Sequence, residues 1–190
     1  MWYKLKRILI YPDGVTEKQV YPAHKPEVYF NFWDWTNSTW TTTGTQWTVT
    51  KYSDRITFYN SSNVSQNYLS QYPIDCTKDF LLEYNAAIPN TSQSYHYVWL
   101  SDLSTKGVFI GTRWENANKF MWNIDGTFTN TSEALWQKNF FIKKEWDTLS
   151  FGWDDTVKYT GTYTFPATLY LYEQVYRNTL TIYTAKLTYL

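Results

Sequence analysis

Apolar and polar residues alternate along most of this chain, in short stretches separated by turn-forming residues. In DFLLEYNAAI, for example, Phe80, Leu82 and Tyr84 alternate with Leu81 and Glu83. The same pattern occurs in TVTKYSDRITFYN, YHYVWLSD, GVFIGTRW, KFMWNIDGTF, EWDTLSFGWDD, ATLYLYE and NTLTIYTAKLTYL. Because successive side chains of a strand point to opposite faces, a period of two predicts half-buried β-strands. Many short strands joined by polar turns predict an all-β, antiparallel sandwich or barrel.

Helical signals are weak. NTSEALWQKNF (residues 130–140) is expected to hold one helical turn, capped by Thr131 or Ser132, and SQNYLSQYP (65–73) to hold another. Neither is long enough to be part of the framework.

The first 27 residues differ from the rest of the chain. RILIY and EKQVY flank the turn signal PDG, and this pattern predicts a short hairpin. YPAHKP follows with two prolines, which favour an extended linker. We therefore expect an anchor or docking segment over residues 1–27 and a β-sandwich over residues 28–190. A lone hairpin is marginally stable in water, so it should dock on its own domain or on a partner.

Composition supports the all-β prediction and limits the partners. Aromatic residues make up 21% of the chain, and such residues favour strands. Lys plus Arg equals Asp plus Glu at 17 each, so the charge favours no nucleic acid partner. A neutral protein with many aromatic side chains is prone to associate, which predicts a homo-oligomer.

The single cysteine, Cys76, excludes an internal disulfide, and it is expected to be a small buried hydrophobe. His24, His96 and Cys76 lie too far apart in the sequence for a zinc motif, and His96 is expected to be structural. The apolar run ILI is too short for a signal peptide, and no stretch has the length of a membrane span. We expect synthesis in a cytoplasm without export and no membrane insertion.

Most of the chain resembles a known fold family. FNFWDW, TQWTVTKYSDRITFYN, KDFLLEYNAAI, EWDTLSFGWDDTVKYTGTYTF and NTLTIYTAKLTYL together resemble the concanavalin A-like lectin/glucanase (laminin G-like) jelly roll over about residues 28–190. Trp146, Leu149, Phe151 and Asp154 match the W-x-x-L-x-[FIV]-x-x-D segment that forms a central strand before a hairpin in that family. The resemblance implies a jelly-roll sandwich whose first and last strands pair.

The leader K-x-I-L-I-x-P-D-G-x-x-x-K-Q-V-x-P resembles small structural proteins of tailed viruses (phages) and their virion appendages. The residues that carry this likeness are Lys6, Ile8, Ile10, Lys18, Gln19, Val20 and Pro22. In such proteins the leader anchors a lectin-like body to the particle. The resemblance therefore implies a location in a virion and other virion proteins as partners.

Enzymatic motifs of the jelly-roll family are missing from the sequence. Its glucanases carry E-x-D-x-x-E, and no such run occurs here. Its lyases use Arg, Gln-x-His and Tyr, whereas the surroundings of Arg113 and His96 do not match those motifs. The adjacent Asp154 and Asp155 are expected to form a hairpin turn. We predict no catalytic residues, no cofactor and no metal site; Asp102, Asp125 and Asp154 are only loose candidates for calcium.

A mixture of flat rings and amides, which carbohydrate surfaces use, occurs in GTRWENANKFMWNIDG. Its candidate ligand-binding residues are Arg113, Trp114, Asn116, Asn118, Trp122 and Asn123. Alternatively, Trp122 packs in the core and the asparagines form a turn. Trp136 is a further candidate for an exposed ring, although a contact between subunits would explain it equally well.

The stretch FNFWDWTNSTWTTTGTQWTVT is unusually rich in tryptophan. Trp33 and Trp35 share one face of a predicted strand, Trp40 is expected in a Thr-rich loop, and Trp47 is expected in the core beside Val49. Its surplus rings indicate a surface that a partner protein covers.

These patterns predict a non-enzymatic structural or host-recognition component of a virion, such as a tail, fibre or capsid decoration. The alternatives are a soluble carbohydrate-binding module and, less favoured, a glycan-active hydrolase or lyase. A carbohydrate-binding module would have surface glycans as its partners.

Overall fold

The computed structural model describes residues 9–11, 14–16, 27–29, 40–42, 48–52, 54–60, 66–87, 95–102, 104, 107–112, 119–134, 137–177 and 179–190. Within these residues every regular element is a β-strand and all strand pairs are antiparallel, which confirms the all-β sandwich. The described residues contain no helix that is long and apolar enough to cross a membrane.

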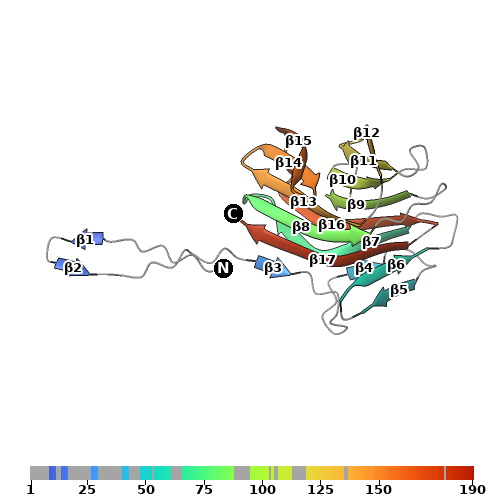
Figure 1. Cartoon of the computed structure of the whole chain (residues 1–190), viewed down its shortest axis with the longest axis horizontal. Coiled ribbons are helices and arrows are strands. Elements are labelled where there is room, and N and C mark those ends of the chain that lie inside the picture. The colour runs from blue at the N-terminus through green and yellow to red at the C-terminus, as the bar shows by residue number, and fades with distance from the viewer. Residues whose placement is uncertain are drawn as a thin grey trace.

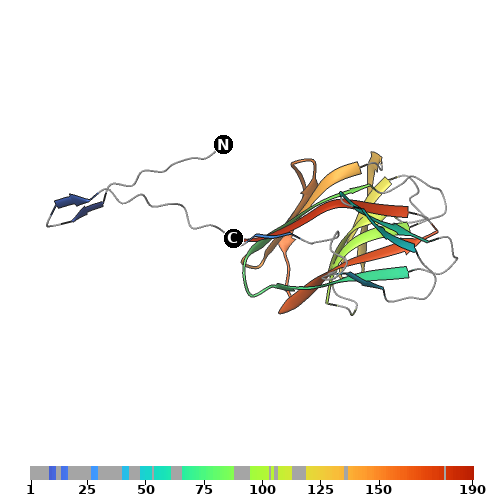
Figure 2. The same cartoon turned by 90° about the horizontal axis from the view of Figure 1, so that it is seen from below.

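Two sheets lie face to face (Figure 1), and Figure 2 shows them as separate layers with β17 in one and β16 in the other. The seven-stranded sheet has the order β12 (Thr127–Ala134), β11 (Lys119–Ile124), β10 (Gly107–Thr112), β9 (Tyr95–Ser101), β16 (Thr168–Tyr176), β7 (Gln66–Asp75) and β4 (Trp40–Thr42). The eight-stranded sheet has the order β15 (Thr156–Thr162), β14 (Thr148–Trp153), β13 (Gln137–Glu145), β8 (Phe80–Ala87), β17 (Thr179–Tyr189), β6 (Ile56–Tyr59) and β5 (Thr48–Lys51).

Strand β17 joins distant parts of the chain. It lies between β8 and β6, and it also pairs with β3 (Glu27–Tyr29) through Leu187 and Val28. Of the described strands, β3 is the first to join either sheet. The pairing of first and last strands that the family resemblance implied is therefore present.

The core lies between the sheets, and the period of two places side chains in it. Burial alternates along β8, and Phe80, Leu82 and Tyr84 are buried as expected. The ring of Phe120 contacts Trp153 at 4.9 Å between centroids, and Tyr84 stacks on Phe140 at 5.0 Å. Aromatic contacts of this kind add to the stability that apolar burial gives.

Two predicted hairpin turns are confirmed. Asp125 and Gly126 have φ of 47° and 92°, and Asp154 and Asp155 have φ of 48° and 60°. Two-residue hairpin turns in which both central residues have positive φ match the twist of the flanking strands, and Asp and Gly tolerate this conformation best.

Both predicted helical turns are wrong. Residues 127–134 form β12 and residues 66–75 form β7. The hydroxyl of Thr131 donates to the carbonyl of Phe120, so its polar side chain secures a strand pair and caps no helix. Strand β12 is an exposed edge strand of mostly polar residues, and it therefore lacks the apolar alternation that marks the other strands.

The N-terminal hairpin exists, but its second strand differs from the prediction. Strands β1 (Leu9–Tyr11) and β2 (Gly14–Thr16) form their own sheet, with Tyr11 opposite Gly14 (Figure 1). The second strand thus starts directly at the turn instead of in EKQVY. The predicted linker (residues 21–26) lies outside the described residues, and the division at residue 27 stays a prediction.

Tryptophan positions in the Thr-rich stretch are only partly described. The prediction that Trp40 lies in a loop is wrong, because Trp40–Thr42 forms the edge strand β4 against β7. Trp33, Trp35 and Trp47 lie outside the described residues.

Candidate functional site

A groove crosses the outer face of the eight-stranded sheet, where outward-facing residues of β8, β13 and β17 meet. Its volume is about 670 Å³, within the range of ligand pockets in proteins. We call it the amide groove, and its lining residues are Leu81, Glu83, Tyr84, Asn85, Asn139, Phe140, Phe141, Lys143, Asp155, Thr184 and Lys186.

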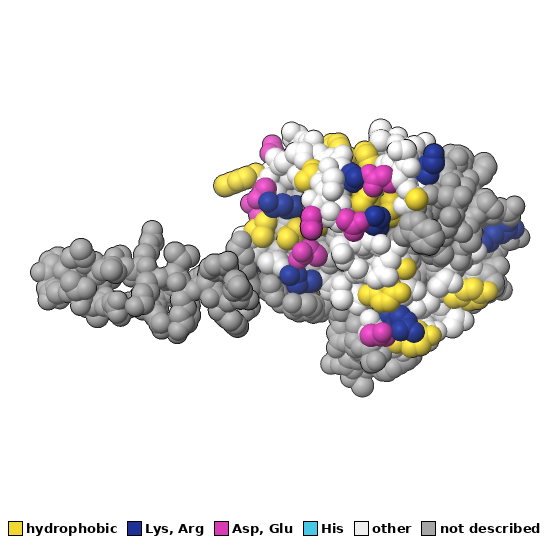
Figure 3. Space-filling model, viewed as in Figure 1, with side chains coloured by type: hydrophobic (Ala, Val, Ile, Leu, Met, Phe, Trp, Pro, Cys, Tyr) yellow, Lys and Arg dark blue, Asp and Glu magenta, His cyan; other side chains and the backbone are white. Residues whose placement is uncertain are grey.

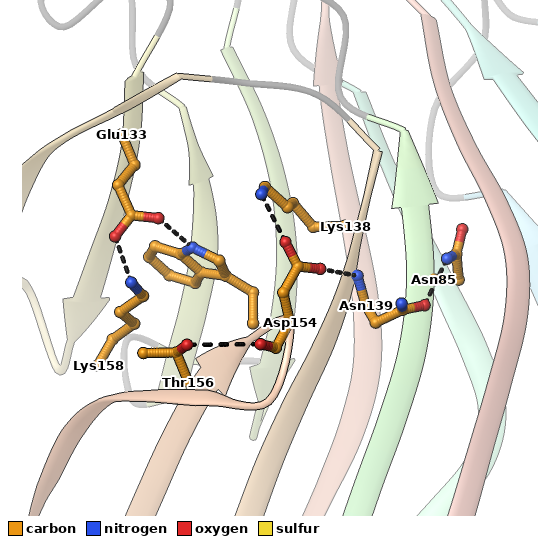
Figure 4. A network of polar contacts seen from close by, with 8 residues as sticks. Asn85, Glu133, Lys138, Asn139, Asp154, Thr156 and Lys158 are labelled. Carbon is orange, nitrogen blue, oxygen red and sulfur yellow. Dashed lines mark hydrogen bonds and ion pairs between the residues drawn. The ribbon is translucent and has the colours of Figure 1, made fainter.

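A row of amides forms one end of this groove. Asn85 and Asn139 lie opposite each other in the register of β8 and β13. The Asn85 Nδ2 donates to Asn139 Oδ1 at 2.5 Å, and Gln137 Nε2 donates to Asn85 Oδ1 at 2.7 Å (Figure 4 shows the asparagines). Amides carry both donors and acceptors, so the row offers both kinds of partner to a hydroxylated ligand.

Phe141 and an ion pair continue the groove along the sheet. Phe141 is half-buried and lies opposite Glu83, whose carboxylate pairs with Lys186 at 2.9 Å. Figure 3 shows acidic and basic side chains interspersed over this side of the molecule. The groove therefore combines an aromatic ring with balanced charge.

Asp154 lies beside the amide end of the groove, at the turn from β14 to β15, next to the lining residue Asp155. Its carboxylate accepts from Lys138 Nζ at 2.5 Å and from the backbone N–H of Asn139 at 3.2 Å (Figure 4). Burial works to raise the pKa of Asp154, but the hydrogen bonds from Lys138 and Asn139 outweigh it, and the net pKa is lowered. Asp154 is therefore an ionised, paired group that fixes the backbone beside Asn139.

Glu133 lies nearby on β12, at the edge of the other sheet. It accepts the indole N–H of Trp153 and pairs with Lys158 (Figure 4). Burial works to raise the pKa of Glu133, yet the bonds from Lys158 and Trp153 lower it overall. Both carboxylates of this cluster are thus ionised and held by lysines.

A general acid needs a carboxyl group with a raised pKa. Among the described residues Glu173 has such a pKa, but it lies away from the groove. Glu173 of β16 is fully buried between the sheets, and desolvation raises its pKa well above the ordinary value. Neither of its oxygens, nor the Tyr84 hydroxyl, has a hydrogen-bond partner among the described residues. A substrate in the groove has no access to it.

Of the residues predicted to bind ligand, the described Trp122 and Asn123 do not line this groove. Trp122 lies on the inner side of its strand, and its ring contacts Phe151 at 5.6 Å and Trp153 at 6.3 Å. Asn123 is buried, and its Oδ1 accepts the backbone N–H of Gly126 in the turn. The alternative reading, a core tryptophan and a turn asparagine, describes the contacts of both residues. Arg113, Trp114, Asn116, Asn118 and Trp136 lie outside the described residues.

The loose calcium candidates have separate protein partners. Asp102 accepts from Ser104, and Asp125 accepts from Gly107 N and the Tyr163 hydroxyl, whereas Asp154 is held by Lys138. In the part of the chain that the structure describes, no three His, Cys, Asp or Glu side chains lie close enough to hold a metal ion.

Two other sequence predictions concern residues that the structure describes. Cys76 is a free, buried thiol, as expected for a small hydrophobe. Of the anchor residues, Ile10 lies in β1, whereas Lys6, Ile8, Lys18, Gln19, Val20 and Pro22 lie outside the described residues.

No protein-family model matches the chain, and the comparison with curated protein sequences found no match. Solved structures do match. The metal-free carbohydrate recognition domain of Emp46p is 12% identical with a TM-score of 0.61, over 78% of this chain and 87% of that chain. The carbohydrate-binding module CBM66 from Bacillus subtilis is 14% identical with a TM-score of 0.55, over 78% and 94%. The Crh5 transglycosylase in complex with NAG is 14% identical with a TM-score of 0.64, over 86% and 83%.

These likenesses show the fold. The chain shares the two-sheet β-sandwich fold of these domains, and this fold agrees with the jelly roll that the resemblance of residues 28–190 implied. The neighbours include binding domains and enzymes, so the choice between them depends on the residues of this chain. The likeness of the leader to virion appendages stays a prediction.

Proposed function

We propose that the chain is a non-enzymatic glycan-binding β-sandwich and that the amide groove is its binding site. The observation that carries the proposal is the juxtaposition of an amide row and a half-buried ring in one groove of about 670 Å³. Sugars present hydroxyl groups that pair with amides and C–H faces that pack on aromatic rings.

The charges of the groove favour a neutral glycan. Its lining holds two acidic residues, Glu83 and Asp155, and two basic residues, Lys143 and Lys186. Glu83 and Lys186 already pair with each other. Because positive and negative side chains balance in the groove, a charged sugar would be repelled as much as attracted. Hydrogen bonds, and not net charge, therefore select the ligand.

The non-enzymatic part of the proposal is supported by the protonation states around the groove. Glycoside hydrolysis needs a protonated acid beside an ionised carboxylate, about 5–10 Å apart. Near the groove, Asp154 and Glu133 both have lowered pKa values and lysine partners. Among the described residues, the carboxyl with a clearly raised pKa is Glu173, which lies in the core.

A glycan array followed by calorimetry tests the proposal. The N139A and F141A variants should each lose affinity about tenfold for the best neutral glycan, since each removes one direct contact. N130A is the matched control, because Asn130 is also an exposed strand asparagine but lies on β12 of the other sheet. Unchanged affinity in N139A and F141A would exclude the groove, and release of reducing sugar from the bound glycan would exclude a purely binding role.

The predicted place in a virion rests on residues 1–27 and remains a prediction. A glycan-binding sandwich on such a leader would be a host-recognition component. Co-purification of the full chain with virus particles, compared with a chain that lacks residues 1–27, tests that role.

A further inference from the structure

Gly152 is buried, although it belongs to the outward-facing side of its strand. It lies directly opposite Phe141 in the register of β13 and β14, and residues that lie directly opposite share one face of a sheet. Thr148 and Ser150, the preceding residues of β14 on that face, are only half-buried. A neighbouring group therefore covers Gly152.

The ring of Phe141 is a side chain that covers this glycine. A Cβ at residue 152 would lie 3.0 Å from Phe141 Cε1 and 2.0 Å from the Thr156 carbonyl oxygen. The ring thus leans across β14 into the space that a side chain at residue 152 would occupy. A glycine in a strand permits such a close approach, because it has no side chain of its own.

Polar side chains surround the ring on its other three sides. Asn139 and Lys143 lie two residues before and after Phe141 on β13, roughly 7 Å away along the strand, and both line the amide groove. Glu83 lies opposite Phe141 on β8 and pairs with Lys186. The ring of Phe141 therefore leans toward the one side on which the opposite residue carries no side chain.

This position decides which part of the ring a ligand meets. A ring that leans on a neighbouring strand keeps one side against the backbone and turns the other toward solvent, which agrees with the half-buried state of Phe141. The face of an aromatic ring carries negative partial charge and attracts the weakly positive C–H groups of a sugar, whereas the ring edge is positive. The groove therefore has an aromatic floor with polar groups around it.

We propose that Gly152 is a positioning residue that keeps the Phe141 ring flat on the sheet, so that the groove selects pyranose sugars whose hydroxyl groups are all equatorial. In such a sugar, of which a β-glucoside is an example, both faces carry only C–H groups and the hydroxyls point outward in the plane of the ring. One face stacks on Phe141 while the hydroxyls reach Asn139, Glu83 and Lys143. An axial hydroxyl would be pressed against the ring without a hydrogen-bond partner. The inference rests on the proposed function of the amide groove.

An NMR titration of the full chain with methyl β-glucopyranoside tests the stacking. The ring current of Phe141 should shift the axial protons of one sugar face upfield and leave those of the other face nearly unchanged. F141L, which keeps an apolar side chain beside Gly152 but has no flat ring, should abolish this shift and lose about tenfold in affinity. N139A should weaken binding but keep the shift. F128A is the matched control, because Phe128 is also an exposed phenylalanine but lies on β12 of the other sheet.

A double-mutant cycle separates the positioning role of Gly152 from its role in stability. G152A should lose about tenfold in affinity for the glucoside, because the added methyl group displaces the ring. In the F141L background the same substitution should cost no further affinity, since no ring is left to displace. A loss of stability alone would act equally in both backgrounds. If G152A does not fold, the affinity and the proton shifts of F141L decide the inference.

The sugar class is tested with methyl β-altropyranoside, which carries an axial hydroxyl on each face and should bind at least tenfold more weakly. If N139A and F141A lose affinity for glycans but the glucoside binds no better than the altroside, the groove binds glycans and the inference is wrong. A G152A variant that binds like the wild type, or a glucoside without a shift confined to one face, would also overturn it. If the chain binds no glycan at all, the proposed function fails as well.

Discussion

The indole N–H of Trp153, on the eight-stranded sheet, donates a hydrogen bond to Glu133, on the seven-stranded sheet. Lys158 pairs with the other oxygen of the same carboxylate and lies 5.0 Å from the centre of the Trp153 ring. Figure 4 shows Glu133 and Lys158 pointing toward each other. A single carboxylate thus links the two layers at the end of the groove.

Replacing Glu133 by Gln should weaken this link only where the carboxylate is ionised. Because the folded pKa of Glu133 is lowered, the extra stability is present above its unfolded pKa and is lost as the pH falls through the folded pKa. We expect E133Q to lower the free energy of unfolding by about 0.5 kcal/mol at pH 7, a small value because the side chain is 39% exposed. Urea denaturation at pH 7 and at pH 3 measures the free energy of unfolding of E133Q and of the wild type. E145Q is the control for the loss of a carboxylate on the surface. An equal loss at both pH values would contradict the prediction.

The buried carboxyl of Glu173 should make the protein less stable at high pH. Its folded pKa is raised, so the folded state binds a proton that the unfolded state releases above its ordinary pKa of 4.5. Stability should therefore fall as the pH rises, by at most about 1.4 kcal/mol per pH unit. E173Q carries no such proton, so its melting temperature should exceed that of the wild type by an amount that grows from pH 5 to pH 8. A gap that does not change with pH would show that Glu173 is not protonated in the fold.

Gly152 should not tolerate a side chain. A Cβ there would lie 2.0 Å from the Thr156 carbonyl oxygen and 3.0 Å from Phe141 Cε1, at an irregularity in the register between β14 and β15. We expect G152A to cost about 2 kcal/mol or more of unfolding free energy, since backbone must move. Gly126 is a useful comparison: its φ is 92° and a Cβ there meets no atom within 4 Å. G126A should cost about 1 kcal/mol, from backbone strain alone. Equal losses of unfolding free energy in G152A and G126A would show that a Cβ at residue 152 causes no steric clash.

Cys76 should be unreactive in the folded protein. Burial raises the pKa of its thiol to about 12, so almost no thiolate exists at pH 8. The Sγ donates to the Ile74 carbonyl oxygen at 3.5 Å. Ellman's reagent at pH 8 should therefore label the native chain at the rate of global unfolding, and label it at once in concentrated urea. Rapid labelling without denaturant would show that the strand end opens locally.

Local signals were enough to predict most of the framework. Alternation along residues 148–153 identified β14, and two adjacent aspartates identified the turn that follows, because both features depend on neighbours in sequence. The same reasoning failed for β12, whose exposed Thr, Asn and Ser residues carry no apolar period. It also failed for Trp40, since pairing with β7 decides that strand.

The candidate site was harder to predict than the fold. Asn85 and Asn139 are 54 residues apart, and each alone resembles an ordinary polar residue on a solvent-facing strand. Only the pairing of β8 with β13 turns them into a row.

The order of the strands has a consequence for how the protein is made. Residues 168–189 supply β16 and β17, and each lies in the interior of its sheet, between β9 and β7 or between β8 and β6. Until these residues leave the ribosome, β8 and β6 have no common neighbour, and the flanking strands expose unpaired edges. Neither layer can therefore close before β16 and β17 are made, although pairs such as β8 with β13 do not depend on them. Loss of β17 by a late frameshift should yield an aggregating polypeptide rather than a smaller sandwich.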